Sequence, residues 1–216
     1  MTGSRDLEQV AAAVRAADSV LLTTHVSPDG DGIGSGLGLA RGLEAQGKQV
    51  GLCLADPIPS FLDFLEGERY VLDEVPNTAP WDVVISLDCG EWERLGGAPG
   101  DRSLFGTVVN LDHHRSNEHF GDIDCILPEV AATGMLAYWV LQGVGAHPDP
   151  MAAQALYTAI ATDTGFFCYS NTDTEVFEVA AALTRAGASP YESHHAVHEN
   201  HSPARLHMMG EALRLG

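Results

Sequence analysis

The fold is decided by residues 20–31, which read VLLTTHVSPDGD. The first five residues are apolar or β-branched, a pattern that predicts a short buried strand. Over residues 32–46 apolar side chains recur at nearly helical spacing, and Gly47 then suits the C-cap of a helix. Residues 20–47 therefore predict a strand, a tight polar turn and a helix.

Three more apolar runs, at residues 49–54, 81–87 and 107–111, have the length and composition of strands. Continuously apolar strands that alternate with helices are typical of a parallel sheet buried on both faces. After residue 130 the pattern becomes helical, with helices predicted at residues 132–142, 151–162, 174–186, 191–198 and 203–215. We predict a single α/β domain over residues 1–216, with an open, mostly parallel sheet flanked by helices and a helical C-terminal half.

The charge balance restricts the partners of this domain. The chain has 11 Lys and Arg against 30 Asp and Glu, which gives a net charge of −19. Duplex nucleic acid needs a basic surface, so we expect no binding to duplexes. A small phosphorylated substrate stays compatible with this charge, because bound divalent ions reverse the local field. No apolar run approaches the roughly 20 residues of a membrane span, so no membrane association is expected.

The four cysteines, Cys53, Cys89, Cys125 and Cys168, show no C-x-x-C spacing. Three of them stand beside apolar residues, which predicts buried free thiols instead of disulfides or a zinc site. The first 15 residues lack the basic flank and apolar stretch of a secretory signal. These features together predict a cytoplasmic protein.

Four separate clusters of metal-ligand residues stand where predicted strands or helices end. They are residues 25–31, Asp88, residues 112–114 and Asp163. They supply five carboxylates and three imidazoles, about the number that two ions with a bridging ligand require. Ligands bind outside the carboxyl ends of strands in open α/β sheets, so one cleft could collect these groups. The inventory predicts metal-assisted hydrolysis of a phosphate ester.

Each cluster also has a simpler interpretation when it is taken alone. P-D-G-D is commonly a solvated turn, and Asp88 alone would be a turn residue. Arg115 offers a guanidinium suited to phosphate, although a loop arginine is more often only solvated. The four histidines at positions 194, 195, 198 and 201 are predicted to form a solvated helix face. The glycine-rich residues 30–38 lack the G-x-G-x-x-G spacing of a dinucleotide site.

The order of the clusters resembles the DHH phosphoesterase superfamily. The matching motifs are H-x-x-P-D-G-D-x-x-G-S at residues 25–35, Asp88, D-H-H at residues 112–114 and T-D-T-G at residues 162–165. Residues 112–122, 156–165 and 169–172 are closer still to one branch, the NrnA-type oligoribonucleases and pAp phosphatases. The resemblance covers nearly the whole chain.

The resemblance implies a site for two Mn²⁺ ions per chain, with Mg²⁺ or Co²⁺ as substitutes. One ion would be held by His25, Asp29 and Asp88. The other would be held by Asp31, Asp88, His113 and Asp163, with Asp88 as the bridging ligand. His114 would lie near the substrate phosphate as a hydrogen-bond donor or general acid, with Arg115 beside it. Asp112 would orient its neighbours, so the catalytic residues would be His114, Asp88 and Asp112.

The same resemblance implies hydrolysis of short oligonucleotides and of 3′-phosphoadenosine 5′-phosphate (pAp). Alternatives within the superfamily are a cyclic di-AMP or pApA phosphodiesterase, a pyrophosphatase and a single-strand exonuclease. Few basic residues are present to build a groove for a long single strand. A non-catalytic nucleotide-binding domain is the rival from another class, but such a protein should have lost a ligand. Whether the chain forms a homodimer is left open.

Members of the resembled family carry a second, C-terminal substrate-binding domain of the DHHA1 type. Its glycine-rich, histidine-containing motif would read G-G-G-H, and no such motif occurs in this sequence. We therefore expect the chain to be the catalytic domain alone, and favour a truncated form over a natural minimal homologue.

Overall fold

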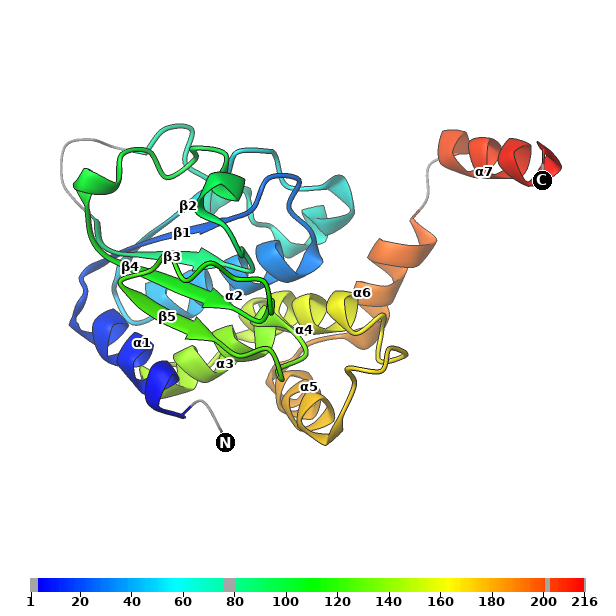
Figure 1. The fold of residues 1–216 in the computed structure, drawn as a ribbon. Helices are drawn as coiled ribbons and strands as arrows, with labels where there is room; N and C mark the ends of the chain where they lie inside the picture. Colours follow the sequence, from blue (N-terminus) through cyan, green and yellow to red (C-terminus); the bar gives the residue numbers. More distant parts are fainter. Residues whose placement is uncertain (1–3, 76–80, 201–202, 216) are drawn as a thin grey trace.

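A computed structural model describes residues 4–75, 81–200 and 203–215 (Figure 1). Its centre is a five-stranded sheet in the order β2-β1-β3-β4-β5. All four neighbouring pairs are parallel. The strands are β1 (Ser19–Thr24), β2 (Gln49–Cys53), β3 (Trp81–Leu87), β4 (Phe105–Asp112) and β5 (Ile123–Ile126). The predicted α/β fold with a parallel sheet is confirmed, and β5 is a strand that the sequence pattern did not predict.

The helices of the C-terminal half lie within a few residues of their predicted positions. The helices are α1 (Ser4–Ala16), α2 (Gly30–Glu44), α3 (Thr133–Gly143), α4 (Pro150–Asp163), α5 (Thr174–Ala186), α6 (Pro190–His194) and α7 (Pro203–Leu215). The helix predicted at residues 191–198 is divided in the structure into α6 and the π-helix His195–Glu199 that follows it. Helix α1 was not predicted. In the described residues no helix is long and apolar enough to cross a membrane.

The two faces of the sheet are covered differently. One face carries the main core, in which α1, α2 and α3 lie against the strands and α4 packs against α2 and α3 (Figure 1). On the other face Leu21, Val84 and Val108 pack with Leu72 and Trp92. Trp92 belongs to a short 3₁₀ helix, one of four: Ser60–Leu65, Glu68–Tyr70, Trp92–Leu95 and Arg102–Leu104. Successive strand residues point to opposite faces, which explains why the strands are apolar throughout.

The four cysteines are unpaired, and all but Cys168 are buried, as the sequence predicted. Burial raises the pKa of Cys53 and of Cys125 to about 12 and that of Cys89 to about 11. Because the thiolate is the reactive form, these three side chains serve as packing groups.

Helices α2 and α4 approach each other closely along a row of glycines. A Cβ atom added at Gly34 would lie 2.5 Å from the carbonyl oxygen of Ala155, and one at Gly38 would lie 2.4 Å from the Leu156 side chain. One added at Gly30 would lie 2.4 Å from Thr162. The helices therefore run antiparallel, and the start of α2 is pressed against the end of α4. The glycine-rich stretch serves this helix packing.

The Gly34→Ala substitution is expected to lower the free energy of unfolding by about 1–3 kcal/mol, the usual cost of overpacking. The new methyl group would meet backbone atoms of α4, which cannot move aside independently. Denaturant unfolding of the purified chain measures the effect. Gly36→Ala is the matched control, because its Cβ would meet only the flexible ends of leucine side chains, the nearest being Leu52 at 3.3 Å. It should be neutral or slightly stabilising through helix propensity, and equal losses in the two variants would contradict close packing at Gly34.

Candidate metal centre

The predicted ligand residues meet at the carboxyl edge of the sheet. His25 follows β1, Asp88 follows β3 and Asp112 ends β4, while Asp31 and Asp163 come from the start of α2 and the end of α4. Three groups place candidate ligand atoms within 4.8 Å of one another: His25, Asp29 and Asp88; Asp31, His113 and Asp163; and Asp88, Asp112, His113 and His114. The structure thus brings together eight of the nine predicted site residues. Arg115 lies exposed on the loop after His114.

In the first group His25 faces two carboxylates. Its Nε2 lies 3.9 Å from Oδ1 of Asp29 and 3.7 Å from Oδ2 of Asp88. Its Nδ1 lies 2.8 Å from the carbonyl oxygen of Val26, which assigns a proton to Nδ1 and leaves Nε2 as the ring nitrogen that faces the carboxylates. The Nε2 distances are too long for hydrogen bonds. They are close to the roughly 3.0–3.6 Å that separates two ligands about 2.1 Å from a shared ion.

The second group repeats this arrangement around His113. Its Nε2 lies 3.5 Å from Asp88 Oδ1, 3.5 Å from Asp163 Oδ2 and 3.8 Å from Asp31 Oδ2. Its Nδ1 lies 3.1 Å from the carbonyl oxygen of Val130. Among the described residues Nε2 is buried without a hydrogen-bond partner. An unsatisfied buried polar atom costs about 1–3 kcal/mol, and a cation at this point would satisfy it.

Asp88 connects the first and second groups, because it is a member of the first and lies 3.5 Å from His113 of the second. Its Oδ1 faces His113 and its Oδ2 faces His25, so one carboxylate spans the two candidate positions. Its φ of 54° lies in the left-handed region, which costs a non-glycine residue about 1–3 kcal/mol. Strain of this kind is concentrated at functional sites. This geometry suits a carboxylate that bridges two ions.

The first turn of α3 holds Asp31. The backbone N–H of Thr133 donates to Oδ2 at 2.7 Å, and that of Gly134 donates to Oδ1 at 2.8 Å. The Thr133 hydroxyl also donates to Asp88 Oδ1 at 3.2 Å. N–H groups in the first turn of a helix have no partners within it, so they are available to a carboxylate. The sequence pattern did not identify Thr133 and Gly134, because any helix start offers the same groups.

Asp112 supports its neighbours and has little capacity left for a metal. Its Oδ1 accepts hydrogen bonds from His114 Nδ1 and from the His113 backbone N–H, both at 2.7 Å. Its Oδ2 accepts one from Asn117 Nδ2 at 2.6 Å. Asn117, which was not predicted as a site residue, is buried. The His114 side chain is 45% exposed, and its Nε2 has no hydrogen-bond partner among the residues that the structure describes.

The carboxylates make both buried histidines strongly basic. Asp29 and Asp88 raise the pKa of His25 to about 10. Burial opposes protonation of His113, but the surrounding carboxylates, Asp88 foremost, raise its pKa to about 10 as well. At neutral pH the metal-free site therefore carries protons on the imidazoles of His25 and His113, at the place where bound cations would otherwise lie.

The carboxylates of the site differ in the direction of their pKa shifts. Burial, together with the charge of Asp88, raises the pKa of Asp163 to about 6 and that of Asp31 well above its usual value. Burial also opposes ionisation of Asp88, yet His113 and His25 hold the pKa of Asp88 well below its usual range. A positive charge nearby would favour the ionised forms of Asp31 and Asp163, which fits the donor set of a cation site.

The metal-free chain is expected to lose stability as the pH rises from about 6.5 to about 10. His25 and His113 stay protonated in the folded chain up to a pKa of about 10, whereas in the unfolded chain they lose their protons around the ordinary histidine pKa of 6.5. Their stabilising contribution is therefore complete below pH 6.5 and is lost as the pH rises through the folded pKa. Tm, measured with a chelator at several pH values between about 7 and 9.5, tests this.

Two controls separate this effect from general charge repulsion. His25→Gln should flatten the pH dependence of Tm, whereas the same change at the exposed His147 should leave it unchanged. Saturation with Mn²⁺ should also flatten it, because the ion takes over the role of the protons. A Tm that does not depend on pH in the chelated chain would contradict the assignment of these pKa values.

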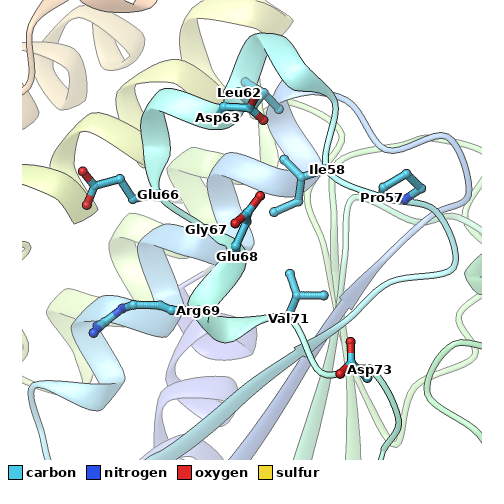
Figure 2. Close-up of a pocket in the computed structure, with 10 residues that line it drawn as sticks. All are labelled: Pro57, Ile58, Leu62, Asp63, Glu66, Gly67, Glu68, Arg69, Val71 and Asp73. Atoms are coloured by element: carbon cyan, nitrogen blue, oxygen red, sulfur yellow. The ribbon is translucent and has the colours of Figure 1, made fainter.

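The structure also has a cavity of about 680 Å³ that is distinct in its lining residues (Figure 2). It is formed by residues 57–73 and includes Asp63, Glu66, Glu68 and Arg69 (Figure 2). The guanidinium of Arg69 is bound to Glu44. None of the three ligand groups contributes to this cavity, so we place the functional site at the sheet edge.

The C-terminal histidines are only partly a solvated face. His194 and His195 have about half of their side chains exposed, at 50% and 53%, as predicted. However, the rings of His194 and His198 also contact Phe166, with centroids 5.3 and 4.6 Å from that of Phe166. His201 lies outside the described residues.

Residues 19–160 match the model of the DHH family, N-terminal domain. The chain is 37% identical over 205 residues to the bifunctional oligoribonuclease and PAP phosphatase NrnA of Thermus thermophilus. That alignment covers 94% of this chain and 61% of the relative. The enzyme of the same name from Bacillus subtilis is 30% identical, over 84% of this chain and 58% of its own length. The chain therefore spans about three-fifths of these relatives.

A solved structure with a similar fold is that of an exopolyphosphatase-related protein from Bacteroides fragilis. It superposes with a TM-score of 0.86 at 27% sequence identity. The superposition covers 97% of this chain and 65% of that one. The similarity includes nearly all of this chain, with its helical C-terminal half.

Proposed function

The chain belongs to the DHH family, and from this membership we propose that it is a two-metal phosphoesterase acting on short oligonucleotides and pAp. The observation that carries the proposal is Asp88, whose two oxygens face histidines of two separate ligand groups. Sites with two metal ions about 3.5–4 Å apart are typical of phosphatases and nucleases. The NrnA relatives, named for these two activities, support the substrate class.

We assign one ion to His25, Asp29 and Asp88, and the other to Asp31, Asp88, His113 and Asp163. The donors are carboxylate oxygens with some imidazole nitrogen, a set that suits Mn²⁺, with Mg²⁺ or Co²⁺ as substitutes. Thiolate is absent from all three candidate groups of the described residues, which argues against a structural zinc site. When bound, the two ions supply charge neutralisation at the transferred phosphoryl group and lower the pKa of water.

His114 is assigned the role of proton donor to the substrate. Its hydrogen bond to Asp112 raises its pKa and so favours the doubly protonated ring, which carries a proton on Nε2 as well as on Nδ1. A protonated Nε2 can donate to a phosphate oxygen or to the leaving oxygen. Asp112 keeps this ring oriented and in turn is fixed by Asn117. Arg115, exposed on the same loop, is assigned as a second phosphate contact.

The charge of the chain favours short substrates over long ones. A net charge of −19 repels an extended polyanion, whereas one or two phosphates can be held by the ions themselves. The four unpaired cysteines suit a reducing compartment, and we place the protein in the cytoplasm.

The test is hydrolysis by the purified chain with Mn²⁺, with a chelated sample as the control. The substrates are pAp, RNAs of about two to five nucleotides, a long single strand and pyrophosphate. We expect kcat/KM to be highest for pAp or the short RNAs and to vanish on chelation. Preference for pyrophosphate or for the long strand would refute the proposed substrate class, and activity without any divalent ion would refute the two-metal mechanism.

A further inference from the structure

A cavity of about 250 Å³ opens beside the metal centre and shares Asp29 and Asp163 with it. Gly30 of α2 and Thr162 of α4 also line it, and the rest of its wall comes from three segments far apart in the sequence: the first 3₁₀ helix, the loop after α4 and the π-helix. The side chains that these segments contribute are Phe61, Phe166, Tyr169, Val197 and His198. Aromatic rings thus stand directly next to the proposed ion ligands.

The ring of Phe166 is held by a strained backbone. Gly165, Phe166 and Phe167 are three consecutive residues in the left-handed region, with φ of 54°, 53° and 68°. This conformation costs a bulky residue about 1–3 kcal/mol and persists only where the surroundings enforce it. The contacts of Phe166 with His194 and with His198, which also lines the cavity, further restrict its ring. Two segments therefore cooperate to keep one aromatic face at the cavity.

Tyr169 provides a second ring that is fixed without being buried. A Cβ atom at Gly165 would lie 2.4 Å from the Tyr169 ring, so the ring lies directly on the glycine backbone. Tyr169 is nevertheless 63% exposed. The ring is positioned for a ligand, because most of its surface stays uncovered.

The chemistry of the wall selects a neutral, flat group. The cavity carries the carboxylates of Asp29 and Asp163 and no Lys or Arg side chain of the described residues, which disfavours a second phosphate. Aromatic faces bind nucleobases by stacking, worth about 1–3 kcal/mol per base. The volume of about 250 Å³ is below the roughly 300–1,000 Å³ of pockets for drug-sized ligands, which suits a single ring system.

We propose that this cavity is the subsite for the nucleobase of the nucleotide whose phosphate lies at the metal centre. The proposal rests on the proposed function and adds the recognition of the base to it. Stacking on Phe166 and Tyr169 is the main interaction, because besides the two carboxylates and the Tyr169 hydroxyl the wall offers only the polar side chains of His198 and Thr162. The subsite therefore tolerates any base, as an enzyme that degrades short oligonucleotides of mixed sequence requires.

The test compares two ligands that differ only by the base. Adenosine 5′-monophosphate and ribose 5-phosphate are titrated by calorimetry into the Mn²⁺-loaded chain. The wild-type chain should bind the nucleotide about 5- to 100-fold more tightly than the sugar phosphate. Tyr169→Ala should remove most of this difference. Val197→Phe, which fills the cavity without changing an aromatic wall residue, should remove it too.

The controls show whether the loss is local. Tyr191→Ala removes another exposed tyrosine, 70% exposed and outside the cavity, and should leave the difference unchanged. The Mn²⁺ content of each variant should equal that of the wild type. Equal affinities of the wild-type chain for the two ligands, or a difference that survives both cavity variants, would overturn the subsite. Hydrolysis of pAp by the same wild-type sample reports separately on the proposed function, which can fail while the base subsite stands.

Discussion

Replacing Asp88 with asparagine is expected to lower kcat/KM by about a thousandfold or more while the chain stays folded. Mutation of a residue that only supports a metal ligand typically costs 10- to 100-fold, and removal of one transition-state donor costs about 10²- to 10³-fold. Asp88 serves two ligand groups at once, so its loss should exceed either effect. An amide has one neutral oxygen and cannot span two cations as a carboxylate does.

The measurements are kcat/KM on pAp, Mn²⁺ content and Tm in the presence of a chelator. The control is Asp82→Asn, at the start of β3, where the carboxylate accepts hydrogen bonds from the backbone N–H groups of Asp18 and Ser19, both at 2.9 Å. Asp82 lies at the amino edge of the sheet, opposite the metal centre. The Asp82→Asn variant should therefore be less stable than the wild type, but its kcat/KM should be unchanged. Near-normal activity and unchanged metal content in Asp88→Asn would contradict the assignment of two ions to this site.

Replacing His113 and replacing His114 are expected to have different effects, the first on metal content and the second on rate. His113→Ala removes an Nε2 that faces three carboxylates, so the chain should retain fewer than two Mn²⁺ after desalting. His114→Ala should keep the metal content, because its Nδ1 is engaged by Asp112, and should lower kcat by about 10²- to 10⁴-fold as a lost acid–base group does.

Elemental analysis and steady-state kinetics on both variants decide the assignment of roles. His195→Gln is the control, since that side chain is half exposed and bound to Glu199, and it should leave the metal content unchanged. Equal losses of metal in His113→Ala and His114→Ala, or a larger loss in His114→Ala, would reverse the roles proposed for the two rings.

The sheet was predictable because each long strand is buried on both faces. A nearly continuous apolar run such as Trp81–Leu87 has the length of a strand and is shorter than most buried helices. Strand β5 has only four residues, and Asp124 interrupts its apolar pattern, so periodicity could not detect it. Helix α1 was not predicted, although Ser4–Ala16 has an amphipathic pattern.

The convergence of the ligand residues was predictable, and the groups that position them were not. The carboxyl ends of parallel strands meet at one edge, so His25, Asp88 and Asp112 had to be neighbours. Thr133 and Asn117 act through hydrogen bonds whose geometry depends on loops with no periodic signal. The aromatic cavity was missed for a related reason, because its wall is built from segments that only tertiary packing brings together.

The spread of the ion ligands along the chain also sets how metal affects folding kinetics. The donors run from the end of β1 to the end of α4, so we expect them to converge late in folding, once the sheet and the α2–α4 contact have formed. Interactions that are absent from the folding transition state slow unfolding without accelerating folding. Bound Mn²⁺ should therefore leave the refolding rate nearly unchanged and lengthen the lifetime of the native state. In a cell, metal supply would then govern how long each finished molecule survives proteolysis, and not how quickly new molecules reach the native state.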